Sequence, residues 1–294
     1  MRRALLMTLG LASACLTLDP FLFNNQDVER YGWDDDPCDP QLRGELTEAE
    51  HRLNGGPAPR CHPSVVPPEQ RVEDFVTLAD GRRIHYVFAH HDDAEATIFY
   101  SHGTSRHLGR YWDRVELMWS MGYNVMVYDY PGYGRSDGEP DEAGVYAAAV
   151  AVFEDVLPQM PGVDTSRVFL LGYSLGGGPT YELALRASEG TLSTVPRGVV
   201  SEAAFCSIEA LVRDGSRLDL PGTFLADHAL DNCAKIARLD PRMPVMIMHG
   251  NADSFIVPTH ADLLLDAAAG DVEYVEIDGA DHTEVPTVMG DDYE

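Results

Sequence analysis

The sequence predicts an α/β fold in which helices cover both faces of a mostly parallel sheet. Short apolar runs of strand type alternate with segments of helical periodicity along most of the chain, and this alternation is typical of parallel strands joined by crossover helices. The chain has 294 residues, of which 45% are hydrophobic. A chain of this size and composition can bury one large core, which favours one folded domain over two.

The predicted elements follow one another in a simple order. A β-hairpin spans residues 75–88 and turns at Asp80-Gly81, a dipeptide that favours tight turns. Further strands are expected at 97–101, 123–128, 168–173, 198–203, 244–248 and 273–277. Helices are expected at 109–120, 142–157, 175–187 and 259–269. Each helix lies between two strands, as the connections of a parallel sheet require.

The most informative motif is Gly172-Tyr173-Ser174-Leu175-Gly176, which has the pattern G-x-S-x-G and directly follows an apolar strand-like run. A serine in such a sharp strand-to-helix turn has its hydroxyl exposed, and the flanking glycines avoid steric clashes in the turn. The motif therefore predicts a catalytic nucleophile at Ser174. A glycine-rich turn without catalytic function is the alternative. A dinucleotide-binding loop is disfavoured, because G-x-G-x-x-G requires a glycine in place of the serine.

A serine hydroxyl is a weak nucleophile at neutral pH, so the motif requires a histidine base and an acid that orients it. Both are found later in the chain. Asp253 follows the predicted strand at 244–248, and His282 follows the one at 273–277. The order Ser174, Asp253, His282 is the nucleophile, acid and base order of α/β-hydrolases, and it differs from that of other serine-protease folds.

Several motifs resemble those of serine hydrolases in the α/β-hydrolase superfamily, in particular those of its Bem46-like and prolyl-oligopeptidase-like branch. The motifs are His102-Gly103-Thr104, residues 128–140, Gly172 to Gly177, residues 201–205, and residues 249–253 with Val257-Pro258. The resemblance covers the chain from about Val72 to the C-terminus. It implies a sheet of the eight-stranded type and a lid after the sixth core strand, which is short here and spans residues 206–241.

Acyl transfer also needs hydrogen-bond donors for the oxyanion, which are normally main-chain amides. The fold supplies the N–H of Leu175, the residue after the nucleophile, and the resemblance implies the N–H of Thr104 as the second donor. The branch commonly has asparagine where this chain has Thr104, but threonine leaves the backbone N–H available. The residue before the catalytic histidine is usually small, whereas this chain has Asp281, a second carboxylate beside the base.

Glu202 is the alternative acid, because it ends a core strand and acids after that strand orient the histidine in some relatives. Its motif at 201–205 favours a structural role, so Asp253 is preferred. No metal-binding pattern of the H-E-x-x-H or C-x-x-C type occurs in the sequence, and no cofactor is implied. The glycine-rich residues 129–140 lack the lysine of a phosphate-binding loop. We expect them to form a wall of the active-site mouth.

Residues 1–14 are predicted to be a secretory signal, with a basic pair, an apolar stretch and the small-residue cleavage site Ala12-Ser13-Ala14. The next residue is Cys15, and the five residues that end with it resemble a bacterial lipobox. Lipidation of Cys15 would anchor the protein in a membrane of the cell envelope. The alternative is simple cleavage to a soluble secreted protein. In the anchored protein, residues 15–71 would form a tether and collar for a hydrolase domain at 72–294.

The other cysteines are Cys38, Cys61, Cys206 and Cys233. Disulfides are the default in an exported protein, and four cysteines allow three connectivities. We prefer the local pairs Cys38–Cys61 and Cys206–Cys233. The first pair would staple a stretch with little periodicity, and the second would tie down the short lid. Buried free thiols are the alternative.

The formal net charge is −27, with 21 Lys and Arg residues. Nucleic acid is not an expected partner, because binding to phosphates requires a basic surface, and membrane association is expected only through a lipid on Cys15. The predicted function is a serine hydrolase that cleaves a carboxylic ester or thioester, with a small-molecule or lipid-like ester as substrate. The alternatives are a serine peptidase, which would usually carry a gating domain or a large lid, and a non-catalytic binding protein, which would usually have a broken triad.

Overall fold

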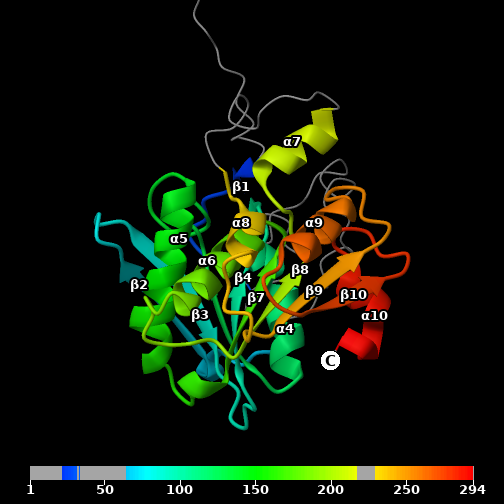
Figure 1. The fold of residues 1–294 in the computed structure, drawn as a ribbon. Coiled ribbons are helices and arrows are strands. Elements are labelled where there is room, and N and C mark those ends of the chain that lie inside the picture. Colours follow the sequence, from blue (N-terminus) through cyan, green and yellow to red (C-terminus); the bar gives the residue numbers. More distant parts are fainter. Residues whose placement is uncertain (1–21, 32, 34–63, 217–228, 294) are drawn as a thin grey trace, which may run out of the picture.

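A computed structural model describes residues 22–31, 33, 64–216 and 229–293. Its centre is an eight-stranded sheet with the strand order β10-β9-β8-β7-β4-β6-β3-β2 (Figure 1). The strands are β2 Arg71–Thr77, β3 Arg83–Ala89, β4 Thr97–Ser101, β6 Asn124–Tyr128, β7 Val168–Tyr173, β8 Gly198–Glu202, β9 Val245–Gly250 and β10 Val272–Ile277. β3 is antiparallel to both of its neighbours, and all other paired strands of this sheet are parallel. The predicted fold class is confirmed.

Helices lie on both faces of the sheet (Figure 1). The α-helices are α4 Trp112–Ser120, α5 Glu142–Ala151, α6 Gly177–Ser188, α7 Ile208–Ser216, α8 Asn232–Ile236, α9 Thr259–Ala267 and α10 Val285–Met289. α5, α6, α8 and α9 contact one another in that order along one face, whereas α4 packs on β6 and α10 on β9 and β10 from the other face. This is the two-sided cover that a parallel sheet requires.

The central strands supply two separate cores because successive side chains point to opposite faces of the sheet. In β4, Phe99 belongs to the core under α5 and α6, whereas the adjacent Tyr100 belongs to the core under α4. In β6, Tyr128 likewise belongs to the core under α5 and α6, and Val127 belongs to the core under α4. All four side chains are at most 1% exposed. Burial on both faces explains why these strands read as continuous apolar runs in the sequence.

Several element boundaries differ from the sequence prediction by a few residues, and two of the differences change the element to which a residue belongs. The strand expected at 244–248 continues to Gly250, so His249 lies within β9 rather than in the loop after it. The helix expected at 142–157 is α-helical only to Ala151 and continues as one π-helical stretch, Val152–Val156. Pro158 follows in a short 3-10 turn, since proline has no N–H to extend an α-helix.

The described part of the N-terminal region packs onto this domain. β1, Asn24–Asn25, pairs in parallel with β5, Ser105–Arg106, in the loop after β4. Phe23 is buried in the core under α5 and α6, and Tyr31 and Trp33 are buried in the core under α4. The region predicted as a collar therefore supplies side chains to both cores.

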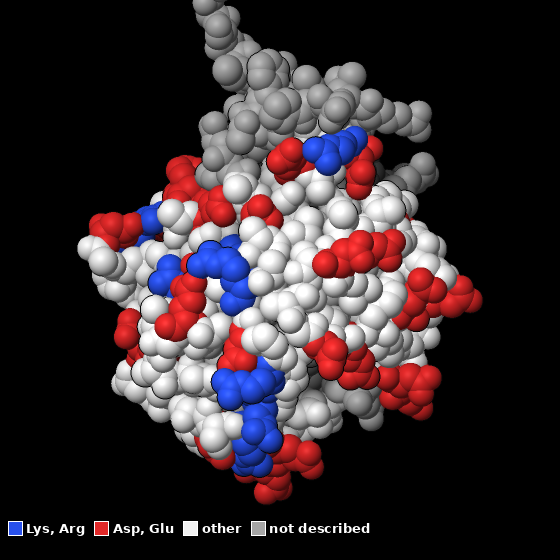
Figure 2. Space-filling view, viewed as in Figure 1, with Lys and Arg blue, Asp and Glu red and all other residues white. Residues whose placement is uncertain are grey.

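The charged side chains are unevenly distributed over the face drawn in Figure 2. Acidic side chains lie singly and in groups both at the margin and within the face, and the basic side chains form a few clusters that have acidic ones beside them. Neighbouring charges of opposite sign largely cancel one another, so these clusters leave little net positive potential for a distant anion. This face of the described chain does not offer the continuous basic surface that phosphate backbones require.

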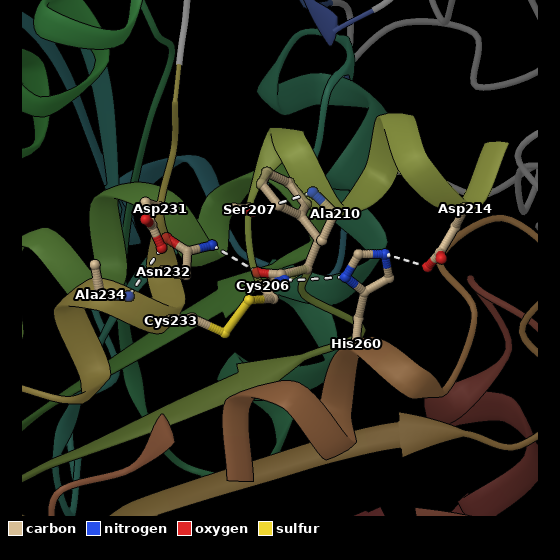
Figure 3. The surroundings of a disulfide bond; sticks show 10 residues. Cys206, Ser207, Ala210, Asp214, Asp231, Asn232, Cys233, Ala234 and His260 are labelled. Carbon is tan, nitrogen blue, oxygen red and sulfur yellow. Dashed lines mark hydrogen bonds and ion pairs between the residues drawn. A yellow bond between two sulfur atoms is a disulfide. The ribbon is translucent and has the colours of Figure 1, made fainter. Parts of the chain in front are cut away.

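A disulfide bond joins Cys206 and Cys233 near the two ends of the segment predicted as a lid (Figure 3). Cys206 precedes α7, and Cys233 lies in α8, which packs against α6 and α9. The backbone N–H of Cys206 also donates a hydrogen bond to Nδ1 of His260 in α9, at 3.2 Å. The disulfide thus ties the start of the segment to the helical layer, and it joins the two cysteines that the sequence analysis prefers as a pair.

Several predictions concern residues outside the described ranges. They are the signal at 1–14, the lipidation site Cys15, the pair Cys38–Cys61 and the middle of the predicted lid. Among the residues that are described, no helix has the length and apolar character needed to cross a bilayer.

Candidate active site

The turn after β7 holds Ser174 in a backbone conformation that residues other than glycine seldom adopt. Its φ angle is 54°, and the 3-10 turn Ser174–Gly176 leads directly into α6. A Cβ atom on Gly176 would lie 1.9 Å from the carbonyl oxygen of Ser101, and one on Gly172 would lie 2.5 Å from the carbonyl oxygen of Gly176. Close backbone contacts therefore require both glycines, as the G-x-S-x-G pattern predicts.

His282 reaches Ser174 from the loop after β10. Its Nε2 atom lies 3.1 Å from Ser174 Oγ, within hydrogen-bond distance. The side chains of Ser174 and His282 are 4% and 6% exposed. The hydroxyl of Tyr173 donates to the carbonyl oxygen of His282 at 3.3 Å, and the ring of Phe255 packs beside the imidazole at 4.9 Å between centroids. These contacts fix the position of the imidazole.

Asp253, in the turn after β9, accepts a hydrogen bond from Nδ1 of His282 at 2.8 Å. Its Oδ1 atom accepts from the backbone amides of Phe255 and Ile256 at 2.9 and 2.8 Å. Burial raises the pKa of this carboxyl, but its contacts with His249 and His282 outweigh burial and hold the pKa of Asp253 below its usual value. The ionised carboxylate keeps the proton of the imidazole on Nδ1 and leaves Nε2 free to accept the proton of the serine.

Glu202, the alternative acid, has another partner. Its carboxylate is fully buried and lies 2.8 Å from Nη1 of Arg114 in α4, and in the described structure no hydrogen bond joins it to His282. The carboxylate of Asp281 accepts from the backbone amide of His282 at 2.8 Å and from the amide of Ser254 at 2.8 Å. It connects the two loops through the main chain.

The two amides predicted to bind an oxyanion belong to neighbouring loops. Leu175 is the second residue of a 3-10 turn, where N–H groups have no partner within the helix. Thr104 follows β4, and within the described chain no acceptor engages its backbone N–H. The close contact between Ser101 and Gly176 joins these two loops. The geometry permits both amides to act as donors to a bound substrate.

A cavity of about 560 Å³ contains both Ser174 and His282 in its lining. Its remaining wall comes mainly from α4 with the turn before it and from α10 with the turn after it. Side chains in this wall include Thr104, Arg110, Arg114, Phe255, Pro286 and Asp291. The sequence analysis missed this wall, because no motif marks α4 or α10 and only their packing on either side of the nucleophile brings them together.

The predicted glycine-rich wall at 129–140 is wrong for this cavity, since none of these residues lines it. Asp129 is instead fully buried beneath the loop after β4, where its Oδ1 atom accepts from the amide of Leu108 at 2.7 Å and lies 3.4 Å from Nε2 of His102. The glycines that follow Asp129 turn the chain around this buried group. The described residues of the predicted lid do not line the cavity either.

The other buried histidines have local roles. His102 Nδ1 donates to the carbonyl oxygen of Gly103 at 2.7 Å, and His249 Nε2 donates to that of Ile256 at 2.8 Å. Burial lowers the pKa of His107 to about 4, so it is neutral at neutral pH. Among the described residues, no group of three or more His, Cys, Asp or Glu side chains has an arrangement that could hold a metal ion.

Comparison with known proteins agrees with this geometry. The family model of the serine aminopeptidases of type S33, Hydrolase_4, matches residues 92–225. The human α/β-hydrolase domain-containing protein 17B is 30% identical to this chain over 219 residues, which are 73% of the chain and 70% of that protein. The chain belongs to the α/β-hydrolase superfamily. Its predicted relationship to the Bem46-like branch is thereby confirmed.

One further relative and one solved structure show how much of the chain is shared in sequence and in fold. The uncharacterized protein YfhR of Escherichia coli strain K12 is 27% identical over 192 residues, which are 65% of this chain and 64% of that protein. The chain therefore spans less than two thirds of the length of this relative. A solved structure of an esterase from Pyrococcus furiosus superposes with a TM-score of 0.61 at 14% identity, and covers 76% of this chain and 87% of the esterase. At that identity the likeness shows the fold alone.

Proposed function

We propose that this protein is a serine hydrolase that cleaves a carboxylic ester or thioester through an acyl-enzyme intermediate. One observation carries the proposal. The hydroxyl of Ser174, the imidazole of His282 and the carboxylate of Asp253 form a continuous chain of contacts, with distances of 3.1 and 2.8 Å. This is the geometry of a nucleophile, its general base and the acid that orients the base.

The steps follow from this arrangement. Nε2 of His282 takes the proton of Ser174 as Oγ attacks the carbonyl carbon of the substrate, and the amides of Leu175 and Thr104 stabilise the oxyanion. The protonated imidazole, stabilised by Asp253, then returns the proton to the departing alkoxide or thiolate. Water activated by the same imidazole attacks the acyl-enzyme, which releases the acid and restores Ser174.

A small ester is the substrate class that fits best. A cavity of about 560 Å³ is within the range of pockets for small molecules, and its wall combines apolar side chains with arginine and carboxylate groups. Solved structures with the same fold include the Pyrococcus furiosus esterase and an acetyl xylan esterase, and these names support ester cleavage. A non-catalytic binding protein is disfavoured by the intact triad.

A fluorophosphonate probe tests the reaction class. Wild-type protein should be labelled at Ser174 and should turn over p-nitrophenyl esters, and a series of acyl chain lengths would define the acyl preference. Lack of both labelling and turnover in a folded, monodisperse sample would overturn the proposal.

A serine peptidase is the second candidate, because the matching family model carries the name serine aminopeptidase. Both reactions use the same triad, so geometry alone does not separate them. Aminoacyl p-nitroanilides, assayed beside the p-nitrophenyl esters of the same acids, separate them directly. A kcat/KM for the anilides equal to or above that for the esters would favour the peptidase.

We also propose that the protein is exported and anchored by a lipid on Cys15. The support is the sequence pattern alone, a basic pair and an apolar stretch followed by small residues and the cysteine. One lipid chain binds a membrane only weakly, so stable anchoring needs more than one acyl group. An anchored enzyme would work beside a bilayer, where lipid-like esters are available.

A further inference from the structure

The N-terminal segment runs beside the loop that carries one of the proposed oxyanion donors. This segment, residues 22–31 and 33, forms β1 and pairs in parallel with Ser105 and Arg106, directly after Thr104. The amide of Gln26 continues the ladder by donating to the carbonyl oxygen of Arg106 at 2.9 Å. The loop after β4 is therefore held at Ser105 and Arg106 by backbone pairing with the N-terminal segment.

The hydroxyl of Thr104 is the central contact between the two. It donates to the carbonyl oxygen of Leu22, accepts from the backbone amide of Asn24 at 3.1 Å, and lies 3.3 Å from the hydroxyl of Tyr133. The backbone N–H of the same residue engages no acceptor in the described chain, and Thr104 lines the cavity together with Ser174. The side chain of Thr104 thus binds the segment, and its amide stays available to a substrate.

The segment itself is firmly attached to the domain. Phe23 is 5% exposed in one core, and the ring of Trp33 stacks between Tyr31 and Trp112, with centroid distances of 4.7 and 4.3 Å. The hydroxyl of Tyr31 donates to the carboxylate of Asp129, which also binds the turn before α4. Since both ends of the segment are buried, its backbone forms a rigid support for the loop.

The supported loop has a backbone conformation that needs such support. Arg106 has a φ of 63°, a value that residues other than glycine rarely adopt. A strained loop holds its shape only where its surroundings fix it. An oxyanion donor must in turn be held in place before the reaction, because its contribution comes from preorganisation.

We propose that the N-terminal segment is a positioning element of the active site, which acts through the Thr104 hydroxyl to hold the Thr104 amide in place for the oxyanion. The inference rests on the proposed hydrolase function and extends it to a part of the chain that lies outside the α/β sheet. It also gives a reason for threonine at this position, where the branch commonly has asparagine. The alternative is that the segment only covers apolar surface and stabilises the fold.

Thr104→Val is the first test, because it removes the hydroxyl at almost constant volume and keeps the amide. We expect kcat for p-nitrophenyl acetate to fall about tenfold or more with KM nearly unchanged. A misplaced oxyanion donor stabilises the transition state less well and has little effect on substrate binding. Thr104→Ser, which restores a hydroxyl, should recover most of kcat. The concentration of active sites is set by fluorophosphonate titration, so that misfolded protein does not enter kcat.

Thr191→Val is the matched control. The hydroxyl of Thr191 donates to the carbonyl oxygen of Arg186 at 3.0 Å, outside the cavity, so this variant also loses a hydrogen bond from threonine to the main chain. Both valine variants should lower Tm slightly, and only Thr104→Val should lower kcat. A Thr104→Val enzyme with wild-type kcat, or an equal loss in both variants, overturns the proposal.

Asn24→Pro tests the segment from its own side, because it removes the amide that donates to Thr104. If both variants act through this one contact, Asn24→Pro lowers kcat in the wild type and has little further effect in the Thr104→Val background. Multiplicative effects of the two substitutions on kcat would show independent roles and reject the proposal.

Ser174→Ala distinguishes a failure of the proposed function from a failure of the positioning role. If that variant retains activity, the proposed function fails, whereas an inactive Ser174→Ala beside a fully active Thr104→Val defeats the positioning role alone.

Discussion

Glu202 at the end of β8 and Arg114 in α4 form an ion pair, with 2.8 Å between Oε1 and Nη1 and side chains that are 0% and 14% exposed. The hydroxyl of Tyr293 donates to the same carboxylate at 2.7 Å. The carboxylate at the end of β8 is therefore used to neutralise Arg114, whose guanidinium also lies 4.1 Å from the centre of the Tyr173 ring. This pairing distinguishes Glu202 from Asp253, the acid that we propose orients the base.

The first prediction ranks the two acids. Asp253→Asn should lower kcat by about 10⁴, since an asparagine favours the wrong imidazole tautomer, while Tm stays close to that of the wild type. Glu202→Gln should lower the free energy of unfolding by on the order of 3 kcal/mol, because it leaves the mostly buried guanidinium of Arg114 without its charge partner, and kcat of the folded fraction should fall far less. Steady-state kinetics and urea unfolding measure both effects. The reverse ranking in kcat would assign the acid role to Glu202.

The second prediction concerns the nucleophile. Ser174→Ala should abolish fluorophosphonate labelling and ester turnover, because no other group attacks the acyl carbon. The fold should persist, since alanine removes one oxygen atom and still fits the turn. Circular dichroism and Tm provide the control. Esterase activity near the wild-type level in Ser174→Ala would disprove the proposed mechanism.

The third prediction concerns the disulfide. Cys206 and Cys233 are 27 residues apart in sequence, and closing a loop of that size in the unfolded chain is worth about 3.5 kcal/mol in the chain-entropy model. A variant with Cys206→Ser and Cys233→Ser should lose stability of this order. Its kcat at low temperature should be retained, because neither residue lines the cavity. Equal unfolding free energies for the variant and the oxidised wild type would contradict the prediction.

The fourth prediction uses Lys235, which is the only lysine in the sequence. Burial lowers the pKa of Lys235 to about 8, although Glu182 opposes this shift. The folded state therefore binds fewer protons than the unfolded state between about pH 8 and the usual lysine pKa near 10.4. Across that window the contribution of Lys235 to the free energy of unfolding rises with pH, and below pH 8 its buried charge costs stability in full.

Lys235→Met tests this pH dependence. The wild type should gain stability relative to the variant between pH 8 and 9.5, with a slope that approaches about 1.4 kcal/mol per pH unit. Urea unfolding of both proteins at several pH values gives the difference, from which the titration of tyrosines that do not contact Lys235 cancels. A difference that is independent of pH would show that Lys235 keeps its usual pKa in the folded protein.

The fifth prediction concerns Cys15. If this residue is lipidated, the mature protein should partition into the detergent phase, and its N-terminal residue should be Cys15 with added acyl mass. Cys15→Ala should yield a soluble enzyme with the same kcat, since the triad lies far along the chain. Intact-mass analysis decides between the possibilities. A mature N-terminus at Cys15 without acyl mass would leave simple secretion, and an uncleaved Met1 would reject the signal.

The eight strands of the sheet, four of the helices that cover it and the residues of the candidate triad could be predicted from sequence, because each depends on a local pattern. Apolar runs mark the buried strands, and G-x-S-x-G marks a turn that requires its glycines, since a Cβ atom on Gly176 would lie 1.9 Å from the carbonyl oxygen of Ser101. Asp253 and His282 were found from their places after two strands, since the carboxyl ends of parallel strands meet at one edge of the sheet.

Other features depended on contacts between distant segments, which leave no local signature. Glu202 ends one strand and Asp253 follows another, and only the position of Arg114 in α4 shows which carboxylate is already paired. The walls of the cavity, misassigned to residues 129–140, come from helices that pack on either side of Ser174. The sequence by itself determined the fold class and the residues of the candidate site, because backbone periodicity and turn sterics act over a few residues. Only the tertiary structure decided which charges pair, what shapes the pocket and how the N-terminal segment supports Thr104, because these depend on side chains that meet only after the chain has folded.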